Sequence, residues 1–319
     1  MYQEFYGLRD LPFELTANPK YLYLTPRHLE ALSNLQYGLA AGKSVTVLVG
    51  EAGTGKTTLL KAAMVSDRCR HVHCVCLSNP ALTRSEFIEI LARSFSLGAQ
   101  AARSKAVLLE DLENALIERK YRGEPSALVV DEAQSLSTEL LEEIRLLANM
   151  ETNAEKLLPL VLVGQPALGM RLEASGLRQL KQRVALRCEI TAFDLSETAE
   201  YIASRIRTAG GMASRLFTRD AVRLIHENSG GIPRTVNVIC DNALIHGLAL
   251  DRRPVDRQMV LDVCQDFRLG DRLAQSPSGP RVREAIDAAS ELDAGHGGSD
   301  SEQRGSDQPR FRLFGVRRR

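Results

Sequence analysis

Residues 50–57 read GEAGTGKT, directly after the apolar run Val45–Val49 and before a stretch with helical period. The segment matches G-x-x-x-x-G-K-[ST] in full, in the strand–loop–helix context that a phosphate-binding loop needs. Glycines let backbone N–H groups curl around phosphates, and the N-terminus of the next helix adds positive charge. We therefore predict a nucleotide-binding loop formed by Gly50, Glu51, Ala52, Gly53, Thr54, Gly55, Lys56, Thr57 and Thr58.

Two side chains of this loop have specific predicted roles. The ammonium group of Lys56 is expected to reach the β and γ phosphates of ATP, and the hydroxyl of Thr57 is expected to bind Mg²⁺. A glycine-rich turn without a ligand is the alternative. The complete motif in its proper context favours the nucleotide site over that alternative.

A pair of carboxylates follows the apolar strand in ALVVDE, residues 127–132. Asp131 is predicted to hold Mg²⁺ through its water shell. Glu132 is predicted to polarise or position the attacking water, which phosphoryl transfer to water requires. Acidic residues also simply cap strand ends, but the presence of the loop at residues 50–57 favours the catalytic interpretation.

Two further polar residues are candidates for contact with the γ-phosphate. Gln165 follows the apolar run Leu160–Val163, which would place its amide near the γ-phosphate or the attacking water. Arg234, in GIPR at residues 231–234, begins a helix from which its guanidinium would couple domain closure to the nucleotide.

An arginine acting on a neighbouring subunit completes the predicted site. Arg183 is expected to project into an adjacent subunit's site as an arginine finger, and Arg178 is a second candidate. Helical arginines are usually solvated, so a plain surface role is the alternative for both. The predicted catalytic set is Glu132, Lys56, Gln165, Arg183 and Arg234.

The order of the apolar runs predicts the fold class. From Ser44 to about Ile190, β-rich runs alternate with amphipathic helical stretches, which indicates an α/β domain with a parallel sheet. Thr83 and Glu86 have capping-box spacing before a helix. From Ala192 only helical patterns remain, which indicates a small all-α lid domain. The strands are expected in the runs Val45–Val49, Val72–Leu77, Leu128–Val130, Leu160–Val163 and, more weakly, near Cys188–Ile190.

The predicted domain organisation has four parts. Residues 1–43 form a lead-in that packs on the ATPase core, 44–191 the α/β ATPase domain, 192–268 the helical lid and 269–319 a disordered tail. The tail is rich in Ser, Gly, Asp, Pro and Gln. A segment of this composition cannot bury enough apolar surface to offset the entropy lost on folding. Its last ten residues, 310–319, combine five arginines with Phe311, Leu313 and Phe314.

That basic, aromatic end has three competing interpretations. In the first, the segment binds an anionic membrane; in the second, it binds the phosphates of a nucleic acid; in the third, it is an inert solubilising tail. Among the functional interpretations we favour the membrane contact.

Composition narrows the class of protein. The chain has 319 residues, 44% of them hydrophobic and 25% charged, with a net charge of +1 from 41 basic and 40 acidic residues. This near-balance neither implies nor excludes nucleic-acid binding. No apolar stretch has the roughly 18–20 residues of a membrane helix, and the N-terminus lacks a secretory signal, so a cytoplasmic location is expected.

Taken together, these parts resemble an AAA+ ATPase with Walker A, Walker B, sensor and lid elements. Within that superfamily the chain resembles the ExeA family, also called general secretion pathway protein A, with its MshM-like and exosortase-associated relatives. The resemblance covers about residues 1–268. It is carried by residues 5–8 (FYGL), 12–13 (PF), 18–24 (NPKYLYL), 28–32 (HLEAL), 130–134 (VDEAQ) and 163–166 (VGQP).

The resemblance implies a bacterial ATPase that serves a protein partner in an envelope or secretion apparatus. ATP and Mg²⁺ are the cofactors expected from the motifs, and an arginine supplied in trans predicts a homo-oligomeric ring or filament. The resemblance places the protein in the cytoplasm, free or peripheral to the inner membrane. Two departures matter. Members of the family continue into a transmembrane helix and a peptidoglycan-binding domain that this sequence lacks, and Ala17-Asn18 stands where Pro-Asp is usual.

The function expected from all of this is ATP hydrolysis that powers assembly or operation of a secretion, pilus or polysaccharide-export apparatus. The alternative is an ATP-dependent DNA-binding scaffold, because the same core resembles transposition regulators of the TniB and TnsC kind. A nucleotide-gated adaptor with little hydrolysis is a third possibility, and Glu132 argues against it.

Overall fold

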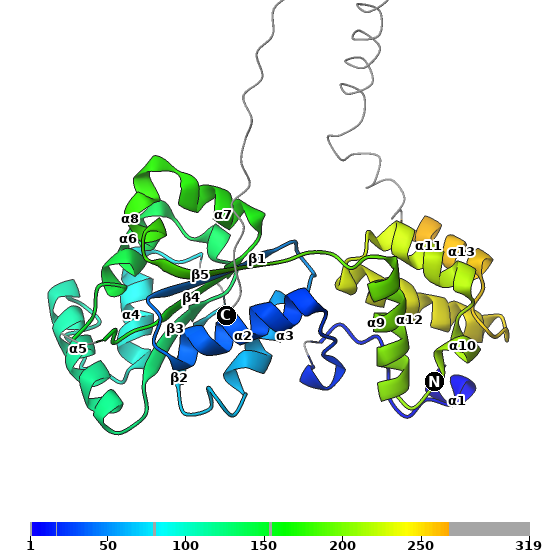
Figure 1. Cartoon of the computed structure of the whole chain (residues 1–319), viewed down its shortest axis with the longest axis horizontal. Coiled ribbons are helices and arrows are strands. Elements are labelled where there is room, and N and C mark those ends of the chain that lie inside the picture. Colours follow the sequence, from blue (N-terminus) through cyan, green and yellow to red (C-terminus); the bar gives the residue numbers. More distant parts are fainter. Residues whose placement is uncertain (1, 17, 79–80, 153–154, 268–319) are drawn as a thin grey trace, which may run out of the picture. The chain divides into compact units, whose positions relative to one another are not determined.

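The computed structural model describes residues 2–16, 18–78, 81–152 and 155–267 (Figure 1). The tail predicted at residues 269–319, with its arginine-rich end, lies outside the described residues, as does Ala17. None of the helices in the described part has both the length and the apolar character needed to cross a membrane.

The predicted parallel sheet is confirmed. Its five strands lie in the order β2-β3-β4-β1-β5, and every pairing between neighbours is parallel. The last strand begins earlier than its apolar run because it lies at the edge of the sheet, where several of its first side chains are exposed. The strands are β1 Val45–Gly50, β2 His73–Leu77, β3 Ser126–Val130, β4 Leu160–Gly164 and β5 Val184–Ile190.

Helices cover both faces of this sheet, and strand residues alternate between the two cores. Leu128 and Val130 pack with the helices after β2, whereas Ala127 and Val129 pack with the helices on the other face. Buried apolar residues at consecutive strand positions are typical of a parallel sheet enclosed between helices. One face carries α2 Pro26–Ala40 and α3 Lys56–Met64, and the other carries α4 Arg84–Ser94, α5 Lys105–Tyr121, α6 Thr138–Leu147, α7 Pro166–Glu173 and α8 Arg178–Lys181.

The remaining helices form an all-α part after β5. Thr218 caps α11 by accepting the N–H of Ala221, and Pro233 occupies the first turn of α12, where its missing N–H costs nothing. The capping box predicted at Thr83 and Glu86 is also present, at the start of α4. The helices are α9 Leu195–Thr208, α10 Ala213–Leu216, α11 Arg219–Ser229, α12 Pro233–Ala249 and α13 Arg257–Asp266.

The lead-in contacts both parts of the molecule. Its helix α2 packs on the sheet. Its first helix, α1 Tyr2–Tyr6, instead packs with the all-α part, where the Tyr2 hydroxyl donates to Asp241 Oδ1 at 2.5 Å. The Tyr6 hydroxyl donates to the carbonyl of Leu244 at 3.1 Å. The difference from the expectation arises because the aromatics of this segment belong to the apolar core of the all-α part. Short 3₁₀ turns lie at Pro19–Tyr21, Ala133–Ser135 (η2) and Ser175–Leu177.

Candidate active site

The strand order brings three chain segments to one edge of the sheet. Strand β4 pairs with β1 on one side and with β3 on the other, and all three run in the same direction. Their carboxyl ends therefore meet, as in other open α/β sheets whose ligands bind at this edge. The loop after β1 begins at Glu51, Asp131 follows β3, and Gln165 follows β4.

The loop at residues 50–57 has the backbone of a phosphate-binding loop. Gly53 and Gly55 have φ angles of +84° and +96°, a region that other residues avoid, and α3 begins directly afterwards at Lys56. Gly50 is required for a different reason. A Cβ atom there would lie 2.7 Å from the carbonyl oxygen of Ile190 in β5.

Lys56 is buried inside this loop, with 5% of its surface exposed. Its ammonium group donates to the carbonyls of Gly50 and Glu51, each at 2.9 Å. Burial lowers the pKa of Lys56 below its usual value, and the charges of Glu132 and Asp131 oppose that shift. The cation therefore lies at the centre of the loop, where phosphate oxygens would be bound.

The side chains of Thr57 and Asp131 contact each other at the carboxyl ends of the strands. The Thr57 hydroxyl donates to Asp131 Oδ2 at 2.7 Å, and the other carboxylate oxygen accepts the backbone N–H of Glu132 at 2.9 Å. A hydroxyl and a carboxylate are the oxygen ligands that Mg²⁺ favours, with phosphate oxygens and water completing its shell. The donor set fits Mg²⁺, although no group of three or more His, Cys, Asp or Glu suited to a metal occurs in the described residues.

Glu132 lines the same cavity as Lys56 and Thr57. Its backbone is left-handed, with φ +54° and ψ +36°, which is uncommon for a residue other than glycine. Its Oε2 accepts Gln134 Nε2 at 2.5 Å, and Gln165 Nε2 lies 3.5 Å away. The amide of Gln165 thus lies beside the Glu132 carboxylate, and Gln165 does not line the cavity.

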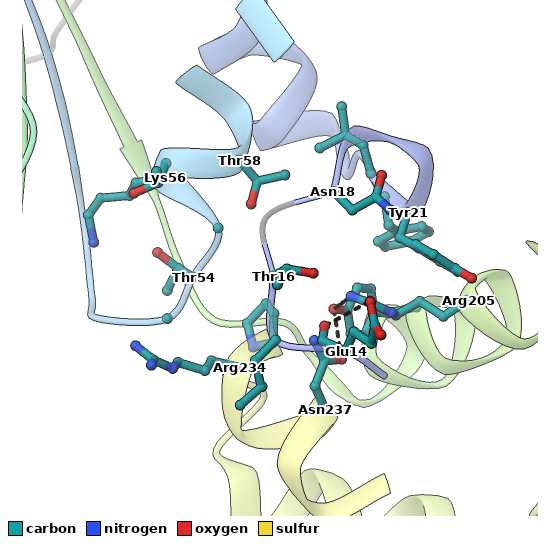
Figure 2. A pocket seen from close by; sticks show the side chains of 18 of the residues that line it. Glu14, Thr16, Asn18, Tyr21, Thr54, Lys56, Thr58, Arg205, Arg234 and Asn237 are labelled. Carbon is teal, nitrogen blue, oxygen red and sulfur yellow. Dashed lines mark hydrogen bonds between the residues drawn. The ribbon is translucent and has the colours of Figure 1, made fainter. Parts of the chain in front are cut away.

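This cavity, of about 290 Å³, extends from the loop to the lead-in and the all-α part (Figure 2). The far side was not predicted from the sequence, because its residues come from the lead-in and the all-α part and the motif at residues 18–24 gave no sign of a contact with the ligand. The residues of the far side include Glu14, Thr16, Asn18, Tyr21, Phe193 and Asn237.

A buried arginine holds that far side together. Arg205, in α9 and 6% exposed, donates to the carbonyls of Pro12 and Glu14 and to the hydroxyl of Tyr201. Its guanidinium also lies 4.8 Å from the centre of the Tyr21 ring. The sequence signal that could have indicated its burial is its helical spacing from Thr198, Tyr201 and Ile202, with which Arg205 shares the buried face of α9.

The predicted arginines occupy different places. Arg234 lines the cavity, and its backbone N–H donates to the carbonyl of Gly53 at 3.2 Å, so the start of α12 contacts the loop directly (Figure 2). Arg183 lies between α8 and β5, and Arg178 begins α8. Neither Arg178 nor Arg183 lines the cavity of its own chain.

Comparison with known proteins agrees with this geometry. Residues 40–172 match a family described as an AAA domain. General secretion pathway protein A of Aeromonas hydrophila is 38% identical over 249 residues, which are 78% of this chain and 45% of that protein. The chain therefore spans about half the length of this curated relative.

Solved structures share the fold. The ORC2 protein of Aeropyrum pernix, solved as ADPNP–ADP complexes, aligns with a TM-score of 0.58 at 18% identity, covering 80% of this chain and 71% of that one. Cdc6p from Pyrobaculum aerophilum aligns with a TM-score of 0.53 at 19% identity, covering 74% and 66%. At these identities the likeness concerns the fold alone. Residues 40–172 thus belong to an AAA domain, and over 249 residues the chain is similar to general secretion pathway protein A, the ExeA-like resemblance that its sequence predicted.

Proposed function

We propose that this protein binds ATP with Mg²⁺ in the cavity beside residues 50–58 and hydrolyses it to ADP and phosphate. The observation that carries the proposal is the hydrogen bond between Thr57 and Asp131, with the Glu132 carboxylate in the same cavity as the Lys56 ammonium. A cation, two oxygen ligands for a metal and a separate carboxylate are the parts that phosphoryl transfer to water needs.

Each residue of the phosphate end has one role in this proposal. Lys56 neutralises charge on the β and γ phosphates, and backbone N–H groups of residues 51–58 bind their oxygens. Thr57 and Asp131 would hold Mg²⁺, which would supply positive charge against the negative charge that develops on the phosphates. Glu132 accepts or orients a proton of the attacking water.

The outer residues complete the proposed site. Arg234 approaches the γ-phosphate from α12, whose first turn contacts the loop. The all-α part would therefore act as a lid whose position depends on which nucleotide is bound. Gln165 acts beside Glu132. Arg183, or Arg178, acts in trans on a neighbouring copy, since neither lines the cavity of its own chain. A head-to-tail contact of this kind generates a ring or filament.

The proposed process is assembly or operation of an envelope apparatus, with a protein partner at the inner membrane. The similarity to general secretion pathway protein A supports it, over the part of that protein that this chain spans. ATP turnover would then drive conformational work on the partner.

Glu132→Gln tests the chemistry. The variant keeps the shape of the side chain and loses its charge, so ATP should bind as in the wild type while kcat for phosphate release falls about 100-fold or more. Binding is measured with a fluorescent ATP analogue and turnover by phosphate release. Equal turnover in wild type and variant would refute the role of Glu132, and a wild type without turnover would refute hydrolysis itself.

Mixing two inactive variants tests the shared site. Arg183→Ala should lower turnover strongly, because an arginine supplied in trans contributes about 10³–10⁵-fold in related chemistry. Combined with Glu132→Gln, it should regain activity, since some interfaces then pair an intact Glu132 with an intact Arg183. The same mixture made with Arg178→Ala identifies which arginine acts. No recovery with either arginine variant would contradict a site shared between copies.

A further inference from the structure

Gln134 connects the ends of two strands through its side chain. It lies in η2, two residues beyond Glu132. Its Nε2 donates to Glu132 Oε2 at 2.5 Å, while its Oε1 accepts the backbone N–H of Gln165 at 3.0 Å. One amide group therefore links the carboxylate that follows β3 to the first residue after β4.

The backbone of Gln134 is also held in place. Arg171, in α7, donates through Nη1 to the carbonyls of Gln134 at 2.6 Å and Leu136 at 2.7 Å. Gly164 leaves room for the contact, because a Cβ atom there would lie 2.7 Å from Gln134 Oε1. Strand β4 thus ends in a glycine where the amide approaches it.

Glu132 needs such a partner. Its left-handed backbone is uncommon for a residue other than glycine, and such a strained conformation persists only where surrounding contacts hold it. The amide of Gln165 reaches the same carboxylate oxygen only at 3.5 Å, a marginal hydrogen bond. Gln134 is therefore the principal side-chain partner of Glu132.

We propose that Gln134 is a positioning residue, which fixes the Glu132 carboxylate for its action on water and ties it to the end of β4. Both amides contact Oε2, which leaves Oε1 to accept the proton from water. The inference rests on the proposed ATP hydrolysis at this site. Misplacement of a reacting group by about 1 Å can cost 10²-fold in rate, so loss of this contact should act on kcat.

The test compares Gln134→Leu with the wild type and with the exposed control Gln265→Leu in α13. We expect kcat for phosphate release to fall about 10–100-fold while the Kd for a fluorescent ATP analogue changes less than about 2-fold. Gln265→Leu should change neither. Gln134→Asn keeps an amide that is one methylene too short to span both partners, so it should show the same pattern if Gln134→Leu fails to fold.

A double-mutant cycle separates positioning from a structural role. If Gln134 acts through Glu132, adding Gln134→Leu to Glu132→Gln should lower the residual turnover no further. A full additional loss in that background, a large loss of ATP binding, or unchanged kcat in both Gln134 variants would overturn the inference while leaving ATP hydrolysis standing. A wild type that does not hydrolyse ATP would overturn the proposed function, and this inference with it.

Discussion

The two ends of the nucleotide cavity are built in different ways. At the phosphate end, Asp131 directly follows β3, and Lys56 and Thr57 begin α3 after the loop that follows β1. These three side chains bind one another or the loop. At the opposite end, the wall is assembled from the lead-in and the all-α part, and Arg205 joins segments about 190 residues apart in the chain. The first end combines two short sequence motifs that follow strands of one sheet, whereas the second end depends on packing between distant segments of the chain.

Because the two ends are built differently, we expect substitutions at the phosphate end to change ligand binding or turnover and substitutions at the opposite end to change the stability of the fold. A substitution at the phosphate end removes a group that meets the ligand, so it should change affinity or turnover and leave folding nearly intact. A substitution at the opposite end removes a contact that holds two chain segments together. It should lower stability first and nucleotide affinity only as a consequence.

Lys56→Ala should give the largest loss of ATP affinity, and it tests the claim that the phosphate end binds the ligand. Hydrogen bonds to charged groups contribute about 1.5–3 kcal/mol, so ATP affinity should fall roughly 10–100-fold. The matched control is Lys61→Ala, an exposed lysine in the same helix, which should bind ATP as the wild type does. Calorimetric titration with ATP and Mg²⁺ measures both. Unchanged affinity in Lys56→Ala would show that the loop does not bind the phosphates.

Arg205→Met tests whether the opposite end of the cavity stabilises the fold. The methionine fills similar space but leaves the buried carbonyl of Pro12 without its donor, which should cost about 2–4 kcal/mol and lower Tm by roughly 5–15 °C. ATP affinity should fall only a few-fold. Arg207→Met is the control, because that arginine is exposed on the same helix. A wild-type Tm in Arg205→Met, measured by thermal unfolding, would show that this contact does not hold the lead-in.

The same contrast explains what could be predicted from sequence. The sheet and the phosphate end were predictable because each strand is a short apolar run, and residues 50–57 and 131–132 are contiguous motifs at strand ends. Arg205 was not, because its partners Pro12 and Glu14 lie far away and an arginine on a helix normally faces water. Gln134 stood in a visible motif, VDEAQ, but its contact with Gln165 depends on the position of β4 beside β3.

His28 gives the smallest effect, where the two ends of the cavity meet. This buried histidine has Nε2 3.4 Å from the carbonyl of Thr54 and Nδ1 2.8 Å from the hydroxyl of Thr25. Burial lowers the pKa of His28 below 6.5, so the unfolded chain binds more protons as the pH falls through that value. Stability contributed by the neutral ring is therefore present above pH 6.5 and lost below it.

The expected change is a shift in the pH dependence of stability. Between pH 7.5 and pH 5.5, wild type should lose more in Tm than His28→Asn, because the other ionisable groups are common to both. Thermal unfolding across a pH series measures this difference. Parallel curves would mean that His28 is equally easy to protonate in the folded and unfolded chain.

ATP bound beside residues 50–58 would extend through the cavity, with its phosphates at the loop and its base at the opposite end. A crystal structure with a non-hydrolysable ATP analogue and Mg²⁺ tests this arrangement most directly. The account predicts Lys56 Nζ turned from the Gly50 and Glu51 carbonyls to the phosphates, Mg²⁺ beside Thr57 and Asp131, and the base between the lead-in and α12. A triphosphate bound away from residues 50–58, or a base outside the cavity, would contradict it.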